Sequence, residues 1–506
     1  MNDDEFGWMV TRLENQAANA PRAFRVKVIL ISIAAYAALF LNLVLIALLL
    51  AWAIFHMREH GASRLSIAVG ALGLVTVPVF WVTVRALLTP LPPPGGRAVT
   101  RAEAPVLFDL LDKMRVKLGG PPIHHVLVDQ EYNACIAQRP RWGLAGPSVN
   151  YLVIGLPFLF GQGTTEMLAV IAHEYGHLCG AHGSMSARIY RQRLIFHEVH
   201  ARIVHTAGAS FWHALMVKAF DAFMPYYNAY TFVLSRQDEY EADRAAARMA
   251  GAPAAATGLI RSTLLGQWFY QHFWAGLYRQ ADTRDSPSFM PYKAMATAFR
   301  LSHEEWASAA GLQAAWRRES NVADTHPCLR ARVQALGQQP VLPTPLQRSS
   351  AATLLGDLGE RLAEEFDRAW WREQSAGWTE RHRHVTRSQA RLHTLRAAQL
   401  PALPLHELQE LALLQAEFDS PQAAKPALEH LLRQPGGPFP MASYTYGRIL
   451  LGEQRGEGLD YLAAAVRHDR RLADEALGIG FVYLLEREGK RRAEEWVYEV
   501  NFVQPS

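Results

Sequence analysis

The chain has 506 residues and a formal net charge of +4, a length that suggests roughly two or three domains. With so small a charge, and no basic run interleaved with aromatic residues, a nucleic-acid partner is not expected. The three cysteines, Cys135, Cys179 and Cys328, are far apart and form no C-x-x-C pair. This spacing argues against a disulfide framework and favours a reducing compartment.

Residues 1–24 are polar, and we expect a short surface tail there. From Val28 to Phe55 the sequence is almost wholly apolar, and only Asn42 interrupts it strongly. This run exceeds the ~20 residues that span a bilayer and is too long for the apolar core of a signal peptide. A second apolar run follows at 65–88. We therefore predict a transmembrane helical hairpin within residues 25–89; the alternative is a hairpin buried in a soluble core.

The basic residues around these two runs predict the orientation of the hairpin. More of them lie before the first run and after the second than between the runs, where only Arg58 and Arg64 stand. Because loops rich in Lys and Arg stay in the cytoplasm, both ends of the hairpin are expected there. The protein would then be a multi-pass protein of the inner membrane.

A proline-rich linker at 90–96 separates the hairpin from a domain predicted over residues 97–340. Apolar residues at helical spacing predict a helix over 101–118, and short strand-like pieces follow at 123–128, 134–138 and 151–154. These pieces predict a small sheet. The adjacent His124 and His125 would point to opposite faces of a strand, so a shared metal is not expected there.

The centre of this domain is an H-E-x-x-H motif, His173-Glu174-Tyr175-Gly176-His177, at the end of an apolar run. We expect a helix that begins at Thr164 or Thr165 and ends at Gly180. On a helix, His173 and His177 share one face and can bind one zinc ion, while Glu174 can take a proton from a water on that ion. The alternative is a chance match on a helix surface, which the apolar flanks disfavour.

A second segment, Ser235-Arg236-Gln237-Asp238-Glu239-Tyr240-Glu241-Ala242-Asp243, offers the carboxylate that such a site needs. On a helix, Glu239 and Asp243 share one face, so Glu239 can complete a tetrahedral site and Asp243 can orient a ligating imidazole. The alternative, a solvated helix, fits Glu241. Residues 207–234 before it are predicted to form partly buried helices, with a third membrane-associated segment as the alternative.

The two apolar runs, H-E-x-x-H and S-R-x-x-E-x-x-A-D together resemble the HtpX and CAAX prenyl protease family of integral-membrane zinc endopeptidases. Asn133-Ala134, ahead of a strand, resembles the N-A motif on the edge strand along which the substrate of these enzymes lies. The run from Thr325 to Arg332, THPCLRAR, resembles their late T-H-P-x-L-x-x-R motif. The resemblance covers roughly residues 25 to 340, with the motifs in the family's order.

The resemblance implies a zincin-like fold that binds one zinc ion per chain through His173, His177 and Glu239, with Glu174 as general base. It also implies that His326 and Arg332 line the active site, where His326 could donate a hydrogen bond to the developing oxyanion. This chain departs from the family in showing no clear further membrane spans between the zinc motifs. It also carries a long C-terminal extension.

The extension begins after the PVLPTP linker, and residues 346–506 are predicted to form a helical domain. Helical pairs recur at 411–432, 444–466 and 477–500, near the period of tetratricopeptide repeats. The alternative is an irregular bundle. In either form, we expect this domain to bind proteins and not to build the zinc site.

The whole pattern predicts a mainly α protein with an α+β catalytic domain: a membrane-anchored zinc endopeptidase whose catalytic domain faces the cytoplasm. Its partners would be protein or peptide substrates, the lipid bilayer and proteins bound by the extension, and its role the quality control or processing of membrane proteins. The alternative is a membrane-tethered scaffold with a structural zinc site and partner-binding repeats. The intact Glu174 speaks against the scaffold, because a structural site needs no base.

Overall fold

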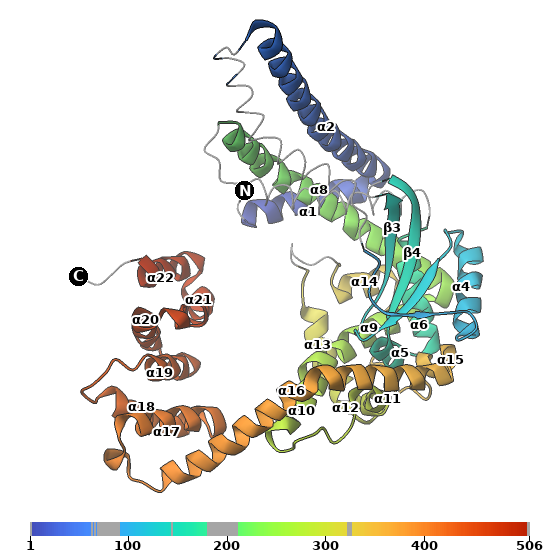
Figure 1. Cartoon of the computed structure of the whole chain (residues 1–506). Helices are drawn as coiled ribbons and strands as arrows, with labels where there is room; N and C mark the ends of the chain where they lie inside the picture. Colours follow the sequence, from blue (N-terminus) through green and yellow to red (C-terminus); the bar gives the residue numbers. More distant parts are fainter. Residues whose placement is uncertain are drawn as a thin grey trace. The chain divides into compact units, whose positions relative to one another are not determined.

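The computed structural model describes residues 3–61, 64, 67, 92–142, 145–179, 211–320 and 326–502. Helices predominate and one small sheet is present, in agreement with the predicted mainly α fold (Figure 1). The chain divides into two compact units. Unit 1 comprises Met1–Leu277 and Phe289–Arg372, and unit 2 comprises Tyr278–Ser288 and Glu373–Ser506.

The sheet of unit 1 has four strands in the order β1-β2-β4-β3; they are β1 (Arg97–Val99), β2 (His125–Asp129), β3 (Ala134–Trp142) and β4 (Ala145–Gly155). Strands β2 and β4 are parallel and the other neighbours are antiparallel. Consecutive residues of β2 and of β4 are buried, as expected for central strands covered on both faces. Among the described residues, β3 has a strand neighbour on one side only, so it is an edge strand. β1 was not predicted, and β3 and β4 are longer than the apolar pieces that predicted them.

Gly155 lets β4 end against the loop that precedes β3. A Cβ at this position would lie 1.5 Å from the carbonyl oxygen of Glu131, so no other residue fits without moving the backbone. The amide of Gly155 donates to the carbonyl of Asn133, at 2.8 Å. The start of the edge strand is thereby tied to the end of its neighbour.

Helices α6, α8 and α9 form the centre of unit 1, where α6 packs against the other two and against β3 (Figure 1). Small residues line their meeting point: Ala169 of α6, Ala246 of α8 and Ala255 of α9 are all buried. The helices of this unit after β1 are α4 (Pro105–Leu118), α5 (Leu156–Gly161), α6 (Thr164–Gly176), α8 (Phe211–Ala250), α9 (Ala252–Trp268), η1 (Phe269–Phe273), α10 (Trp274–Arg279), α11 (Pro291–Leu301), α12 (His303–Trp306), α13 (Ala309–Arg317), α14 (Leu329–Ala335), α15 (Ser350–Leu354) and the first part of α16 (Asp357–Arg396).

The N-terminal residues differ from the expected surface tail, because α1 (Asp3–Asn19) packs on α8. Val10, Leu13 and Ala17 of α1 recur at helical spacing and are buried. They form a core cluster with residues from the start of α2 (Pro21–His60) and from the middle of α8, among them Phe24, Val28, Phe232 and Val233. Because most of this segment is polar, its narrow apolar face was not recognised in the sequence.

The predicted membrane hairpin is not supported: in the described part of the chain, no helix has the length and apolar character that crossing a membrane requires. The first predicted span lies within α2. The second, 65–88, lies outside the described residues except for Ile67.

Residues beyond the proline-rich linker still belong to unit 1. Ser350 donates from Oγ to the carbonyl of Leu159 and from its amide to the carbonyl of Gln162, at 2.7 and 2.8 Å. Asp367 of α16 accepts from the amides of Tyr292 and Lys293 at the start of α11, at 2.8 and 3.2 Å. The buried apolar side chains of this segment include Leu354, Leu358, Leu362 and Phe366. The core of unit 1 thus includes the first part of the extension.

Unit 2 consists of helical pairs at the positions predicted for them, although their assignment to tetratricopeptide repeats is not supported. The pairs are α17 (Leu405–Phe418) with α18 (Pro421–Leu432), α19 (Pro440–Gly452) with α20 (Gly458–His468), and α21 (Ala473–Glu488) with α22 (Lys490–Phe502). Short turns η2 (Gln280–Asp282), η3 (Leu400–Ala402) and η4 (Arg470–Leu472) complete the unit. The cores of the three helical pairs are apolar.

Candidate metal centre

Helix α6 carries the H-E-x-x-H motif, and its first turn is held by charges that the sequence pattern did not reveal. Its N-cap is Gly163, not Thr164 or Thr165. Glu166 accepts a hydrogen bond from the Gly163 amide at 2.8 Å. The same carboxylate receives two hydrogen bonds from Arg261 of α9, at 2.7 and 3.1 Å. Both side chains are nearly buried, so the pair fixes the start of α6 in a medium of low dielectric constant.

The end of α6 is fixed by close contact with α8. The helix stops at Gly176 instead of Gly180, which lies outside the described residues, and His177 is its C-cap. A Cβ on Gly176 would lie 3.0 Å from the Cα of Ala242 and 3.0 Å from the Cβ of Ala245. Glycine therefore lets α8 approach the turn that carries His177. The same contact explains why a small residue, Ala242, stands at the fourth position of the E-x-x-A-D motif.

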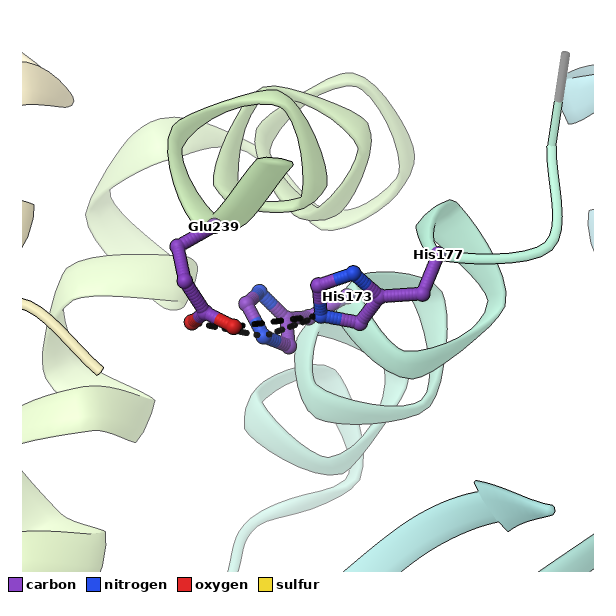
Figure 2. A group of neighbouring side chains, drawn as sticks. All are labelled: His173, His177 and Glu239. Carbon is purple, nitrogen blue, oxygen red and sulfur yellow. Dashed lines mark hydrogen bonds and ion pairs between the residues drawn. The ribbon is translucent and has the colours of Figure 1, made fainter. Parts of the chain in front are cut away.

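Three side chains from these two helices converge, as Figure 2 shows: His173 and His177 from α6, and Glu239 from α8. The Nε2 atoms of the two imidazoles are 3.3 Å apart. The Glu239 carboxylate lies 3.6 Å from His173 Nε2 and 3.5 Å from His177 Nε2. His173 and Glu239 are buried, whereas His177 is half-buried.

These donor spacings fit a tetrahedral zinc ion. Zinc bonds to imidazole nitrogen and carboxylate oxygen are about 2.0 to 2.2 Å long, so neighbouring ligand atoms of a tetrahedron stand roughly 3.3 to 3.6 Å apart. The three distances between the side chains fall within this range. The residues present therefore suit zinc.

Asp243 and Arg332 hold His173 in place, and Arg332 also lies beside the converging atoms, 3.4 Å from Nε2 of His173 and 3.8 Å from Oε2 of Glu239. Nδ1 of His173 lies 3.0 Å from Oδ1 of Asp243, so this nitrogen carries the proton and Nε2 is left as the electron-pair donor. Arg332 of α14 binds both oxygens of Asp243, at 2.7 and 3.0 Å. Burial would raise the pKa of Asp243, but the hydrogen bonds from His173 and Arg332 outweigh it and lower the pKa to about 2. The carboxylate is thus ionised at neutral pH.

The electrostatics of the two other motif residues suit their predicted roles. Burial lowers the pKa of His177 to about 4, so its imidazole is neutral and able to bind a metal at pH 7. Burial raises the pKa of Glu174, and the neighbouring Glu239 carboxylate acts in the same direction. A carboxylate whose pKa is moved toward neutrality is better suited to take and return a proton.

His326 also lies at the centre, as the resemblance implied. Its Nδ1 is 2.7 Å from Oε2 of Glu239, and its side chain is 57% exposed. The hydrogen bond to Glu239 raises the pKa of His326. His326 is thus a proton donor on the solvent side of the site. Thr325, which precedes it in the motif, lies outside the described residues.

Asn133 and Ala134 mark the start of β3, the edge strand that packs against α6. The Asn133 side chain accepts a hydrogen bond from the Ala134 amide at 2.8 Å, which fixes the strand's first residue. Burial raises the pKa of the next residue, Cys135, to about 11, and the Glu174 carboxylate adds to this rise. The helix that carries Glu174 thus packs against the edge strand.

The neighbouring polar residues have other partners. Asp238 pairs with Arg25 at 2.5 Å, and Glu241, whose side chain is 45% exposed, lies 3.4 Å from the same Arg25. His124 accepts a hydrogen bond from the Asn150 amide, and His125 stacks on Tyr151. Glu166 is the acidic residue that the sequence places in the first turn of the helix. Sequence reasoning missed the supporting roles of Arg261 and Arg25, for which there was no local signal.

Residues 157–339 match the model of Peptidase family M48. No curated protein and no solved structure matches the chain. The match covers α6, α8 and α14, the helices that supply the three converging ligands, Glu174, Asp243 and Arg332. The matched part of the chain, with its two histidines and one glutamate at zinc-ligand spacing, is therefore similar to Peptidase family M48, the metallopeptidase family of HtpX and the CAAX prenyl proteases.

Proposed function

We propose that the protein is a zinc-dependent endopeptidase with one ion per chain. The observation that carries this proposal is the place of Glu174. It follows the ligand His173 directly, its pKa is raised by burial, and its helix α6 packs against the edge strand β3. A structural zinc site would not need a base beside an open strand edge.

The residues divide the work as follows. His173, His177 and Glu239 would hold the ion, which when bound supplies Lewis acidity that acidifies water and polarises a carbonyl. Asp243 keeps the proton of His173 on Nδ1. Glu174 accepts a proton from the attacking water and returns it to the leaving amine. His326 donates a hydrogen bond to the oxyanion that develops at the scissile carbonyl.

The substrate would bind as an added strand on β3. Among the described residues, β3 has a strand neighbour on one side only, so backbone groups on its other side can pair with an extended peptide. At the start of β3, the carbonyl of Asn133 accepts from the Gly155 amide and its side chain accepts from the Ala134 amide. The pairing of β3 with β4 ends at this residue, and we expect the added strand to begin beside it. Recognition through the main chain suits substrates of varied sequence, as in the quality control or processing of membrane proteins.

We further propose attachment to the inner membrane through residues 25–89, with the catalytic unit in the cytoplasm. Large apolar side chains are exposed along α2, including Leu30, Ile33, Phe40, Leu41, Leu48, Ile54 and Phe55. An apolar surface of this extent calls for cover by lipid or protein. Retention in membranes after alkaline carbonate washing is expected. A reporter fused after Ser506 that is active only in the periplasm would contradict the orientation.

Unit 2 is proposed to bind protein partners, because stacked helical pairs present extended surfaces of the kind that repeat proteins use.

The alternative for the whole chain remains a scaffold with a structural zinc site. Zinc content and casein cleavage, measured for the wild type and for Glu174→Gln, distinguish the peptidase from the scaffold. The peptidase should bind one zinc per chain in both forms and lose about 10²- to 10⁴-fold in cleavage rate in the variant. A variant that cuts casein as fast as the wild type would overturn the proposed mechanism.

A further inference from the structure

The stretch of α8 that carries Glu239 is bound by charged side chains from the two N-terminal helices. Arg25, near the start of α2, lies 2.5 Å from Asp238 and 3.4 Å from Glu241. These two carboxylates flank Glu239 in the sequence. Arg236 of α8 lies 2.6 Å from Glu14 of α1. Both N-terminal helices therefore contact α8 within three residues of the zinc-ligand position.

The Arg25–Asp238 pair lies largely inside the protein. The side chains are 13% and 12% exposed, and the apolar cluster of Val10, Leu13, Phe24, Val28 and Phe232 lies on the same three helices. In such surroundings, removing one partner strands a charge away from water, which is far more costly than losing an exposed ion pair. The pair therefore constrains α8 strongly.

The constraint matters because Glu239 is sensitive to the rotation of its helix. A helix with its side chains has a diameter of about 10 to 12 Å, so a carboxylate near the surface moves roughly 1 Å for a 10° rotation about the axis. That shift is about half the length of a zinc–oxygen bond. The contact of Gly176 with Ala242 limits how closely α6 and α8 approach, but it leaves rotation of α8 to other contacts.

We propose that Arg25 and Asp238 are positioning residues that set the rotation of α8, so that Glu239 faces His173 and His177. This inference rests on the proposed zinc site. It assigns the N-terminal helices a role in metal binding, in addition to any attachment to a membrane. Arg25 and Asp238 contact neither substrate nor metal and act through Glu239.

The test uses the full-length protein loaded with Co²⁺, whose visible absorption reports the geometry of its ligands. Arg25→Asp and Asp238→Arg are compared with the double exchange Arg25→Asp/Asp238→Arg, and affinity is measured by competition with a chelator. Each single variant should bind Co²⁺ about 10- to 100-fold more weakly, as when a residue that orients a metal ligand is lost, with an altered spectrum. The double exchange should recover affinity and spectrum. Arg244→Asp is the matched control, because Arg244 is exposed on the same helix and its pair with Glu241 is long, at 4.0 Å.

Circular dichroism well below the melting temperature establishes that each variant is folded. If a reversed charge prevents folding, Asp238→Asn keeps the shape of the side chain and should still weaken Co²⁺ binding relative to the Arg244→Asp control. Wild-type affinity and spectrum in the folded single variants, or in Asp238→Asn, would overturn the inference and leave the peptidase proposal standing. A wild type that binds no Co²⁺ or Zn²⁺ would instead refute the metal site itself.

Discussion

The two units of the chain differ in what they bury. In the described residues, every buried Asp, Glu, His, Lys or Arg side chain lies in unit 1, namely Glu166, His173, Glu239, Asp243, Arg261 and Asp367. The buried polar side chains of unit 2 are neutral, among them Ser388, Thr445, Tyr444 and Tyr446. Its charged pairs, such as Arg391 with Glu407 and Glu410, are partly exposed. Because buried charge is tolerated only when it is paired, unit 1 depends on particular partners, whereas unit 2 depends mainly on apolar packing.

The largest effect is expected where a truncation cuts into unit 1. A chain that ends at Pro345 lacks Leu354, Leu358, Leu362 and Phe366, which are buried, and it should fail to fold. A chain that ends at Arg372 keeps these residues and should bind zinc at full stoichiometry. Soluble yield, circular dichroism and bound zinc measure both. If the shorter chain is folded and holds zinc, the core of unit 1 does not need this segment.

The next effect concerns the buried pair at the start of α6. Arg261→Met leaves the Glu166 carboxylate without its partner and should lower the free energy of unfolding by about 3 to 5 kcal/mol. Chemical denaturation followed by circular dichroism measures this change. Replacing both residues, as Glu166→Gln with Arg261→Met, should recover part of the loss, since no charge is then stranded. A single variant as stable as the wild type would show that water reaches Glu166.

A smaller effect is expected at the residue that orients His173. Asp243→Asn weakens the hold on the Nδ1 proton and should reduce zinc affinity about 10- to 100-fold. Competition with a chromophoric chelator measures this affinity. Asp460→Asn, at an exposed position of unit 2, is the matched control and should leave it unchanged. Equal affinities for the two variants would contradict the proposed role of Asp243.

The smallest effect is expected in unit 2. Arg391 lies 2.9 Å from both Glu407 and Glu410, but its side chain is 36% exposed. Exposed ion pairs contribute little because water solvates the charges that remain. Arg391→Met should therefore leave the denaturation midpoint close to that of the wild type. A loss as large as that of Arg261→Met would remove the contrast between the units.

The zinc-ligand positions could be predicted because their signals are local. His173 and His177, and likewise Glu239 and Asp243, recur four residues apart on single helices. The supporting residues could not be predicted in this way. Glu166 and Arg261 are 95 residues apart in the chain, and Arg25 and Asp238 are 213 apart. Such pairs form only in the tertiary fold, and the spacing of residues along the sequence does not indicate them. The case of α1 is different, because its apolar residues do recur at helical spacing and only its polar composition led to the prediction of a tail.

The contact between Gly176 and Ala242 has a consequence for recognising such proteins in genomes. The pattern H-E-x-x-H specifies three positions, and chance matches are frequent. Here, a Cβ at the position before the second histidine would crowd α8 at 3.0 Å, and the fourth residue of E-x-x-A-D is the small residue that it meets. A search that requires small residues at both places uses a steric fact shared by two distant motifs. It should reject many chance matches, because a bulky residue at either place would keep the three ligands apart.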